Sequence, residues 1–170
     1  RMRSGNSGFG TKGAVRGAAN HYDTMSLDKL RSLPVGDWAE DDAHLYVWVT
    51  NAFMREAHEL IKAWGFEQKT IVTWCKPQIG MGWYFRNSTE HAIFAVRGKR
   101  MRLKRQDLPT WLVARRGQHS AKPDEFYALV EQASPGPYLD VFARKQRFGW
   151  DVAGNEVYSA IPELAARPTG

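Results

Sequence analysis

Cysteine is almost absent from this sequence of 170 residues, in which Cys75 is the only one. A single thiol excludes an internal disulfide framework and a cysteine-based zinc cluster, so we expect a reducing, intracellular setting. No apolar run reaches the roughly 20 residues that a membrane-spanning helix needs, and no signal peptide is recognisable. The five histidines are not spaced as metal ligands, and we therefore expect no metal site.

Acidic side chains are scarce in two parts of the chain, whose formal net charge is +6. Residues 1–20 hold four basic and no acidic residues, and residues 97–116 hold eight basic residues and one acidic residue. Such clusters are typical of surfaces that contact the phosphates of nucleic acid, and solvated loops are the alternative interpretation. The candidates for phosphate contacts are Arg97, Lys99, Arg100, Arg102, Lys104 and Arg105.

The composition is that of a folded domain, because 43% of the residues are hydrophobic and 12% are aromatic. Runs of β-branched and aromatic residues alternate with stretches in which apolar residues recur at helical spacing. This order of elements favours a three-layer α/β domain over an all-β domain. We predict strands over residues 43–50, 66–75, 90–96 and 138–142, and helices over residues 26–30, 51–64 and 123–133.

Local signals predict where these elements end. Ser26 is the expected N-cap of the first short helix, which Pro34 should end, and Asn51 is the expected cap of the second helix. Gly65 suits the C-terminal position of that second helix. The uninterrupted apolar run of residues 43–50 indicates a strand that is covered on both faces.

Residues 118–156 combine a helix start, a strand and several polar groups. Ser120 and Pro123 precede two carboxylates, as is favoured at a helix N-terminus. Asp140 lies in the strand that follows, and Arg144 comes directly after that strand. This arrangement is typical of a nucleoside pocket at the carboxyl edge of an α/β sheet. Pairing of Asp140 within the sheet and an ion pair of Arg144 are the alternatives.

Two glycine-containing loops carry weaker signals. Residues 8–13 match the G-x-G-x-x-G pattern of dinucleotide-binding folds, but no strand can precede them, so we do not assign that function. Residues 80–87 place Trp83, Tyr84 and Phe85 between glycine and arginine. Exposed rings in such a loop stack on bases, whereas buried rings serve as hinge packing, and the sequence alone allows both.

The chain contains, in this order, the motifs ANHYDTMSLDKL, LYVWVTNAFMREAHELIKAWGF, TWCKP, NSTEHAIFAVRGK and HSAKPDEFYALVEQASPG, followed by LDVFAR and GNE. Together, over about residues 20–156, they resemble the MT-A70 family of adenine N6-methyltransferases. The resemblance implies a Rossmann-like methyltransferase fold with S-adenosylmethionine as the methyl donor. It also implies transfer of the methyl group to the exocyclic amine of adenine in DNA or RNA.

The resemblance also assigns roles to single residues. At the donor pocket it implies contacts from His119, Ser120, Lys122, Asp140, Arg144, Asn155 and Glu156. At the acceptor base it implies the catalytic residues Tyr22, Glu90 and Lys122, with Trp74 to Lys76 in a flanking segment. A solvated charge at a helix start is the alternative for Lys122, and ordinary loop packing is the alternative for Tyr22.

One motif of the family is missing from the sequence. It is the tetrapeptide Asp-Pro-Pro-Trp, whose carboxylate and proline carbonyl accept hydrogen bonds from the adenine amine and which should stand immediately before Arg1. We expect this motif and its catalytic strand to lie upstream in the parent protein. The methyltransferase domain is expected over residues 1–157, with a flexible basic loop over residues 1–20 and a peripheral tail over residues 158–170.

We expect DNA as the substrate, with the target base flipped out of the stack, because the chain is small and shows no accessory RNA-binding module. Methylation of RNA is one alternative, and a non-catalytic scaffold subunit that binds nucleic acid is another. A homodimer or a heterodimer with a family member is a possible assembly. We expect a cytoplasmic location in a bacterial or phage-infected cell.

Overall fold

The computed structural model of the chain describes residues 25–99, 102–117, 121–154 and 160–161. A mixed four-stranded sheet with the strand order β1-β3-β2-β4 forms its centre. β3 runs antiparallel to β1 and β2, whereas β4 runs parallel to β2. The carboxyl ends of β1, β2 and β4 therefore meet at the same edge as the amino end of β3. The strands are β1 (Ala43–Val49), β2 (Glu67–Cys75), β3 (Thr89–Arg97) and β4 (Trp111–Val113).

Helices and a second, smaller sheet make up the other elements. In chain order the helices are α2 (Leu27–Arg31), α3 (Val35–Trp38), the 3-10 turn η1 (Asn51–Phe53), α4 (Met54–Ala63) and α5 (Asp124–Ala133). β5 (Leu139–Val141) and β6 (Asp151–Ala153) pair in parallel as a two-stranded sheet. The sequence patterns do not predict α3, β4 or β6, because three or four residues are too few for a hydrophobic period to show.

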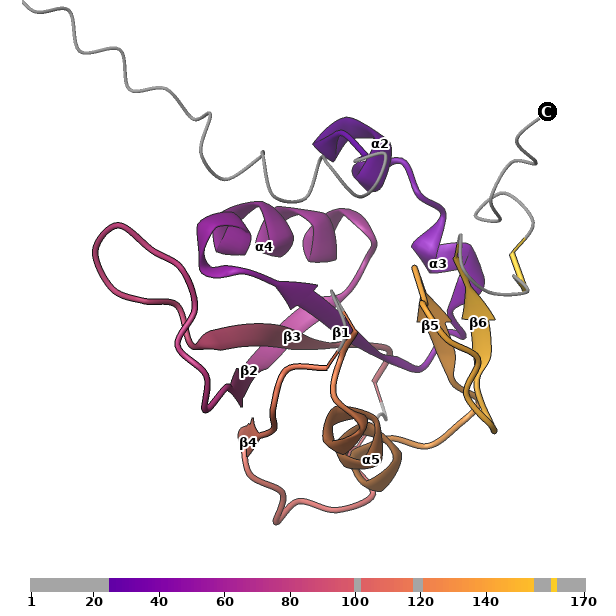
Figure 1. The fold of residues 1–170 in the computed structure, drawn as a ribbon. Helices are drawn as coiled ribbons and strands as arrows, with labels where there is room; N and C mark the ends of the chain where they lie inside the picture. The colour runs from indigo at the N-terminus through magenta and orange to yellow at the C-terminus, as the bar shows by residue number, and fades with distance from the viewer. Residues whose placement is uncertain (1–24, 100–101, 118–120, 155–159, 162–170) are drawn as a thin grey trace, which may run out of the picture.

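The four-stranded sheet is covered by α4 on one face and by α5 on the other (Figure 1). Successive side chains of β3 point to opposite faces of the sheet. Ile93 therefore packs in one core cluster with Ile61 of α4, while Ala92 packs in a second cluster with Phe126 and Val130 of α5. This arrangement confirms the predicted three-layer α/β architecture. Within the described ranges, no helix is long and apolar enough to cross a membrane.

The expected helix ends are confirmed in part. Ser26 caps α2 as predicted, because its hydroxyl accepts a hydrogen bond from a backbone amide of the helix at 3.3 Å. α2 ends at Arg31, one residue beyond the predicted end, and Pro34 stands at the N-cap position of α3. The prediction that Asn51 caps a helix is wrong: Asn51 lies inside η1, whose N-cap position is Thr50. Gly65 follows α4 with a φ of +82°, the left-handed conformation that glycine favours at a helix end.

The surroundings of β1 differ from the expectation. The apolar run of residues 43–50 predicts a strand covered on both faces, but only Val49 of β1 is buried and its other residues are partly exposed. The reason is topological, since β1 is the end strand of its sheet. Its apolar side chains pack against the core clusters on both faces of the sheet, but they stay partly exposed along the free edge of the strand.

The buried core predicts a mutational effect on stability. Ile61 and Ile93 are 1% and 0% exposed. Ile93→Ala should lower the free energy of unfolding by about 2–5 kcal/mol, because it removes buried methyl groups and leaves a cavity. The control Phe148→Ala, at a ring that is fully exposed, should change it by less than about 0.5 kcal/mol. Denaturant titrations measure the free energy of unfolding of both variants. If both variants lose the same stability, this assignment of the core is wrong.

Candidate functional site

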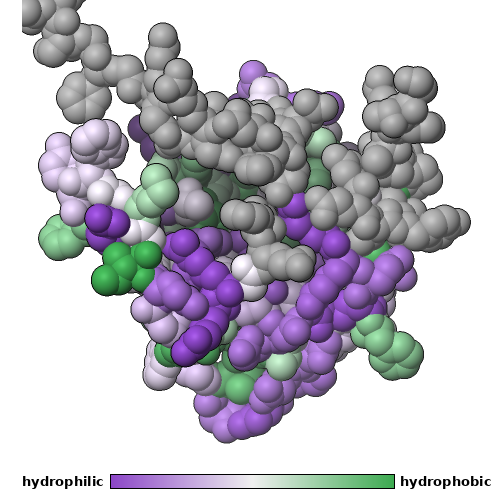
Figure 2. Space-filling model, viewed as in Figure 1, coloured by the Kyte–Doolittle hydropathy of each residue, from purple (hydrophilic) through white to green (hydrophobic). Residues whose placement is uncertain are grey.

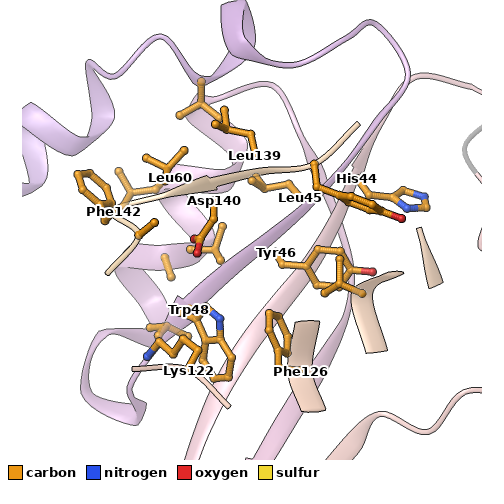
Figure 3. Close-up of a pocket in the computed structure, with 18 of the residues that line it drawn as sticks. His44, Leu45, Tyr46, Trp48, Leu60, Lys122, Phe126, Leu139, Asp140 and Phe142 are labelled. Atoms are coloured by element: carbon orange, nitrogen blue, oxygen red, sulfur yellow. The ribbon is translucent and has the colours of Figure 1, made fainter. Parts of the chain in front are cut away.

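A cavity of about 1560 Å³ lies between β1 and β5 (Figure 3). Side chains from both faces of β1 line it, with Leu45 and Val47 on the α4 side and Tyr46 and Trp48 on the α5 side. A cavity lined by both faces of a strand runs along the edge of that strand. Each of β1 and β5 has one edge without a strand partner in the described part of the chain. We call this cavity the inter-strand slot. The residues of β5 that line it are Leu139, Asp140 and Val141.

Most side chains along the slot are apolar, and a cluster of two lysines and one glutamate lies at one end, which we call the charged end. In Figure 2, part of this lining is visible as green, hydrophobic surface set back behind the outer atoms. Charged side chains enter the slot where strands end: Lys76 follows β2, Glu90 is near the start of β3, and Lys122 precedes α5. In open α/β sheets, ligands bind outside the carboxyl ends of the strands. The charged end of the slot is at this place.

Glu90 is held by two lysines, one at each carboxylate oxygen. Lys122 Nζ donates to Oε2 at 2.9 Å, and Lys76 Nζ donates to Oε1. Only 5% of the Lys76 side chain and 24% of the Glu90 side chain are exposed. Burial would raise the pKa of the Glu90 carboxyl, but the charges and hydrogen bonds of Lys122 and Lys76 outweigh it and hold that pKa below its ordinary value. Glu90 is therefore a fixed, ionised acceptor at neutral pH.

A tryptophan ring accompanies each of these lysines. Lys76 Nζ lies 4.5 Å from the centroid of the Trp74 ring, and Lys122 Nζ lies 4.4 Å from that of Trp48. An ammonium group over an indole ring is attracted by the ring's quadrupole, and this contact helps to hold both lysines in place. Lys122 is thus not a solvated charge at a helix start.

Lys76 is the site residue that the sequence interpretation underestimates, because the resemblance placed it only in a flanking segment. A signal was present in the sequence. Side chains two residues apart in a strand share a face, so Trp74 and Lys76 point to the same side of the sheet. In the register of β2 and β3, Trp74 lies opposite Glu90.

Asp140 points into the slot from the β5 side (Figure 3). Tyr127 Oη donates to its Oδ2 at 2.8 Å. Burial raises the pKa of Asp140, although the hydrogen bond from Tyr127 and the positive charges of Arg147 and Lys122 oppose that rise. Burial and the nearby carboxylate also raise the pKa of Tyr127, which keeps its hydroxyl a donor. The free lone pairs of Asp140 can accept hydrogen bonds from a ligand's hydroxyl groups.

The turn after β5 brings two parts of the chain together beside Asp140. Phe142 has a φ of +65°, which residues other than glycine seldom adopt, and its ring is 48% exposed at the slot. The Ala143 amide donates to Ala153 O at 3.0 Å. A Cβ on Gly154 would lie 2.5 Å from the Ala143 carbonyl oxygen, so only glycine permits this approach. The end of β6 is thus held next to the turn that leads to Arg144, which also lines the slot.

The structure brings together three of the predicted site residues, Glu90, Lys122 and Asp140, and places Arg144 along the same slot. Lys76, Trp48 and Tyr127 also contact these residues, although the sequence analysis does not place them in the site. Among the described residues, no group of three or more His, Cys, Asp and Glu side chains is arranged to hold a metal ion. The predicted residues outside the described ranges are Tyr22, Arg100, His119, Ser120, Asn155 and Glu156.

Several of the basic residues predicted to contact phosphates also have partners within the chain. Arg97 donates to a carbonyl of α3 at 2.6 Å, and Lys104 donates to a carbonyl in the last turn of α5 at 2.6 Å. Arg105 pairs with a neighbouring aspartate at 2.7 Å but stays 51% exposed. Lys99 and Arg102 are exposed to solvent. Contacts of this segment to nucleic acid stay a prediction.

The three layers, together with a slot whose charged end lies at the carboxyl ends of the strands, are those of a Rossmann-like α/β domain. A family model described as MT-A70 matches residues 11–156 of the chain. This protein belongs to the MT-A70 family, as the sequence motifs predict.

Curated relatives of this family are similar to most of the chain. The N(6)-adenosine-methyltransferase MT-A70-like protein of Drosophila melanogaster is 30% identical over 147 residues, which cover 80% of this chain and 24% of the relative. The human N(6)-adenosine-methyltransferase catalytic subunit METTL3 is 28% identical over 160 residues, which cover 86% of this chain and 27% of the relative. The chain therefore spans about a quarter of the length of these curated relatives.

Replacing Glu90 tests the charged end of the slot. Glu90→Gln should lower the free energy of unfolding at pH 7 by on the order of 3 kcal/mol, because Lys76 would stay buried without a counter-ion. The ionic contribution of Glu90 is complete above its ordinary pKa of 4.5 and is lost as the pH falls through its lowered pKa in the folded state. The free energies of unfolding of Glu90→Gln and of the unmodified protein should therefore become more similar as the pH falls.

Denaturant titrations between pH 3 and pH 7 measure this difference. Glu67→Gln is the matched control, because the pair of Glu67 with Lys69 is largely exposed and should contribute little. A loss for Glu90→Gln that does not depend on pH would contradict the ionised state assigned to Glu90.

Proposed function

We propose that this chain forms part of an enzyme that methylates the N6 amine of adenine in a polynucleotide, with S-adenosylmethionine as the methyl donor. The observation that carries the proposal is the Glu90 carboxylate, which two lysines hold in one orientation in the slot that Asp140 also lines. The printed names of the relatives, N(6)-adenosine-methyltransferases, support the same reaction.

On the acceptor side, Glu90 has the properties that binding of adenine needs. The exocyclic amine is a poor nucleophile, because its lone pair is delocalised into the ring. Acceptors that are fixed in advance orient the amine towards the methyl group and stabilise the charge that develops on it. Glu90 can accept from the amine edge of the base because its lowered pKa keeps it ionised, and Lys76 and Lys122 keep it from turning away.

On the donor side, the residues along β5 fit the nucleoside part of S-adenosylmethionine. Asp140 can accept hydrogen bonds from ribose hydroxyls, while the exposed face of Phe142 suits a purine ring. Gly154 keeps the end of β6 close to the β5 turn, where a side chain would not fit. When bound, the donor supplies an electrophilic methyl group on a positively charged sulfur. Asp140 of β5 and Phe142 of the following turn would hold it, in the slot that Glu90 also lines.

We further propose that a β-strand carrying the Asp-Pro-Pro-Trp motif, from polypeptide outside this sequence, occupies the slot. A strand edge without a partner presents backbone donors and acceptors that need hydrogen bonds. One strand between β1 and β5 would pair with both edges and join the two sheets. Side chains from both faces of β1 would then be covered, which is what the apolar run of residues 43–50 predicts.

The names of the relatives support one of the two candidate polynucleotides, RNA and DNA. Adenosine, which the relatives' names contain, is the ribonucleoside. We therefore propose RNA as the polynucleotide, and DNA, which the sequence analysis favours, stays an unconfirmed prediction. The human relative is named as a catalytic subunit, which supports assembly with another chain. A dimer with a family member and the cytoplasmic location also stay predictions.

Transfer of a labelled methyl group tests the proposed function. The full-length parent protein should methylate adenine in a single-stranded RNA oligonucleotide, and the matched DNA oligonucleotide should be the poorer substrate. Glu90→Gln should lower kcat/KM by about 100-fold, in the range found when a fixed transition-state partner is removed. Glu67→Gln is the control. If no methyl group is transferred to either oligonucleotide and calorimetry detects no binding of the donor, the chain would instead be part of a scaffold subunit.

The salt dependence of binding tests the basic segment. The double variant Lys99→Ala with Arg102→Ala should weaken binding of an oligonucleotide and reduce the slope of log K against log salt concentration by about 1–2, since each lost phosphate contact releases fewer counterions. Arg55→Ala with Lys69→Ala removes the same charge from other exposed positions and should leave the slope unchanged. Equal slopes for both variants would favour the solvated-loop interpretation.

A further inference from the structure

The loop between β2 and β3 displays three consecutive aromatic rings to solvent. Trp83, Tyr84 and Phe85 are 99%, 98% and 92% exposed, and Met81 is 88% exposed. Figure 1 shows this loop standing out from the body of the molecule. Large apolar side chains that gather on a surface mark an interaction site. Packing at a hinge, one of the two interpretations of the sequence, is wrong because the rings touch too little of the protein.

The backbone of this loop is built to hold its tip outward. A Cβ on Gly80 or on Gly82 would lie 2.2 Å from a backbone oxygen on the opposite side of the loop, so both positions require glycine. At the base of the loop, the Lys76 amide donates to Ser88 O at 2.7 Å. The two sides of the loop thus approach each other closely, and the aromatic residues occupy the turn between them. The backbone of the loop is restricted by these contacts, and the rings project from it into solvent.

The charge around the loop fits a polyanion. Residues 77–88 contain Arg86 and no acidic residue. Arg115 and Arg116 are exposed beside the loop, and Arg116 Nη2 donates to Asn87 O at 3.5 Å. Aromatic faces for the bases combined with cations for the backbone are the two features that proteins use to bind single-stranded nucleic acid.

The loop also lies next to the charged end of the slot. Its two ends connect to Lys76 and Glu90, the residues that form the ion pair. Asn87 of the loop and Arg116, which donates to its carbonyl oxygen, both line the slot. The aromatic loop is therefore within the neighbourhood of a base that enters this end of the slot.

We propose that residues 78–88, the aromatic loop, bind single-stranded polynucleotide by stacking Trp83 and Tyr84 on the bases that flank the target adenine. The proposal rests on the proposed function, which makes a polynucleotide the partner. It adds a contact that is tolerant of sequence, because every base offers an aromatic face. Binding through this loop requires neither the donor nor methyl transfer.

The test is the affinity of the full-length protein for a fluorescently labelled single strand of about 12 nucleotides, a length within the range of known single-strand sites. Fluorescence anisotropy is measured without donor. Trp83→Ala and Tyr84→Ala should each weaken binding on the order of 5- to 100-fold, without changing the salt slope. Trp83→Phe keeps an aromatic face and should bind within a few-fold of the unmodified protein, whereas Trp83→Leu should weaken binding as Ala does. Phe148→Ala, at an equally exposed ring, is the matched control.

Unchanged affinity of Trp83→Ala and Tyr84→Ala would overturn the proposal. If Trp83→Leu binds the oligonucleotide as tightly as the unmodified protein does, the proposal is also overturned, because leucine has no aromatic face to stack on a base. Sedimentation then tests whether the loop is a protein interface instead. It is one if Trp83→Ala dissociates an assembly of the protein while oligonucleotide binding stays intact. If the unmodified protein transfers no methyl group but its binding still depends on Trp83, the proposed function fails and the loop assignment stands.

Discussion

The site depends on one ionic arrangement, a glutamate held between two lysines. Lys76 is buried, so its charge needs a counter-ion, and Glu90 supplies it from the neighbouring strand. Glu90 in turn is anchored on its other oxygen by Lys122, which lies just before the start of α5. The arrangement therefore links β2, β3 and α5 at the point where a ligand would enter. Trp74 and Trp48 restrict the two ammonium groups further.

A second constraint comes from the slot itself. Water can satisfy an open strand edge, but it does not cover the apolar side chains that β1 presents on both of its faces. Glu90 and Asp140 both line this slot, so whatever fills it would lie beside both carboxylates. Under the proposed function, a strand that fills the slot would therefore complete the sheet and the proposed site together.

The wall formed by α5 and β5 is stiffened by aromatic and ionic contacts of its own. Arg147 lies 3.8 Å from the centroid of the Tyr127 ring and also pairs with Asp124 at the start of α5. Tyr127 then donates to Asp140. A chain of contacts therefore runs from the surface of α5 to the carboxylate in the slot. It explains how Asp140 keeps one orientation although β5 is only three residues long.

The sequence by itself determined the layered α/β class, the family, and the positions of Glu90, Lys122 and Asp140, because hydrophobic period and ordered motifs are local properties of the chain. It missed the shortest elements and misplaced the cap at Asn51, since a single turn carries no period. Only the tertiary structure decided the role of Lys76, the edge position of β1 and the exposure of the aromatic loop. Each of these depends on which distant segments come into contact, and contact between segments far apart in the chain is not written in the spacing of neighbouring residues.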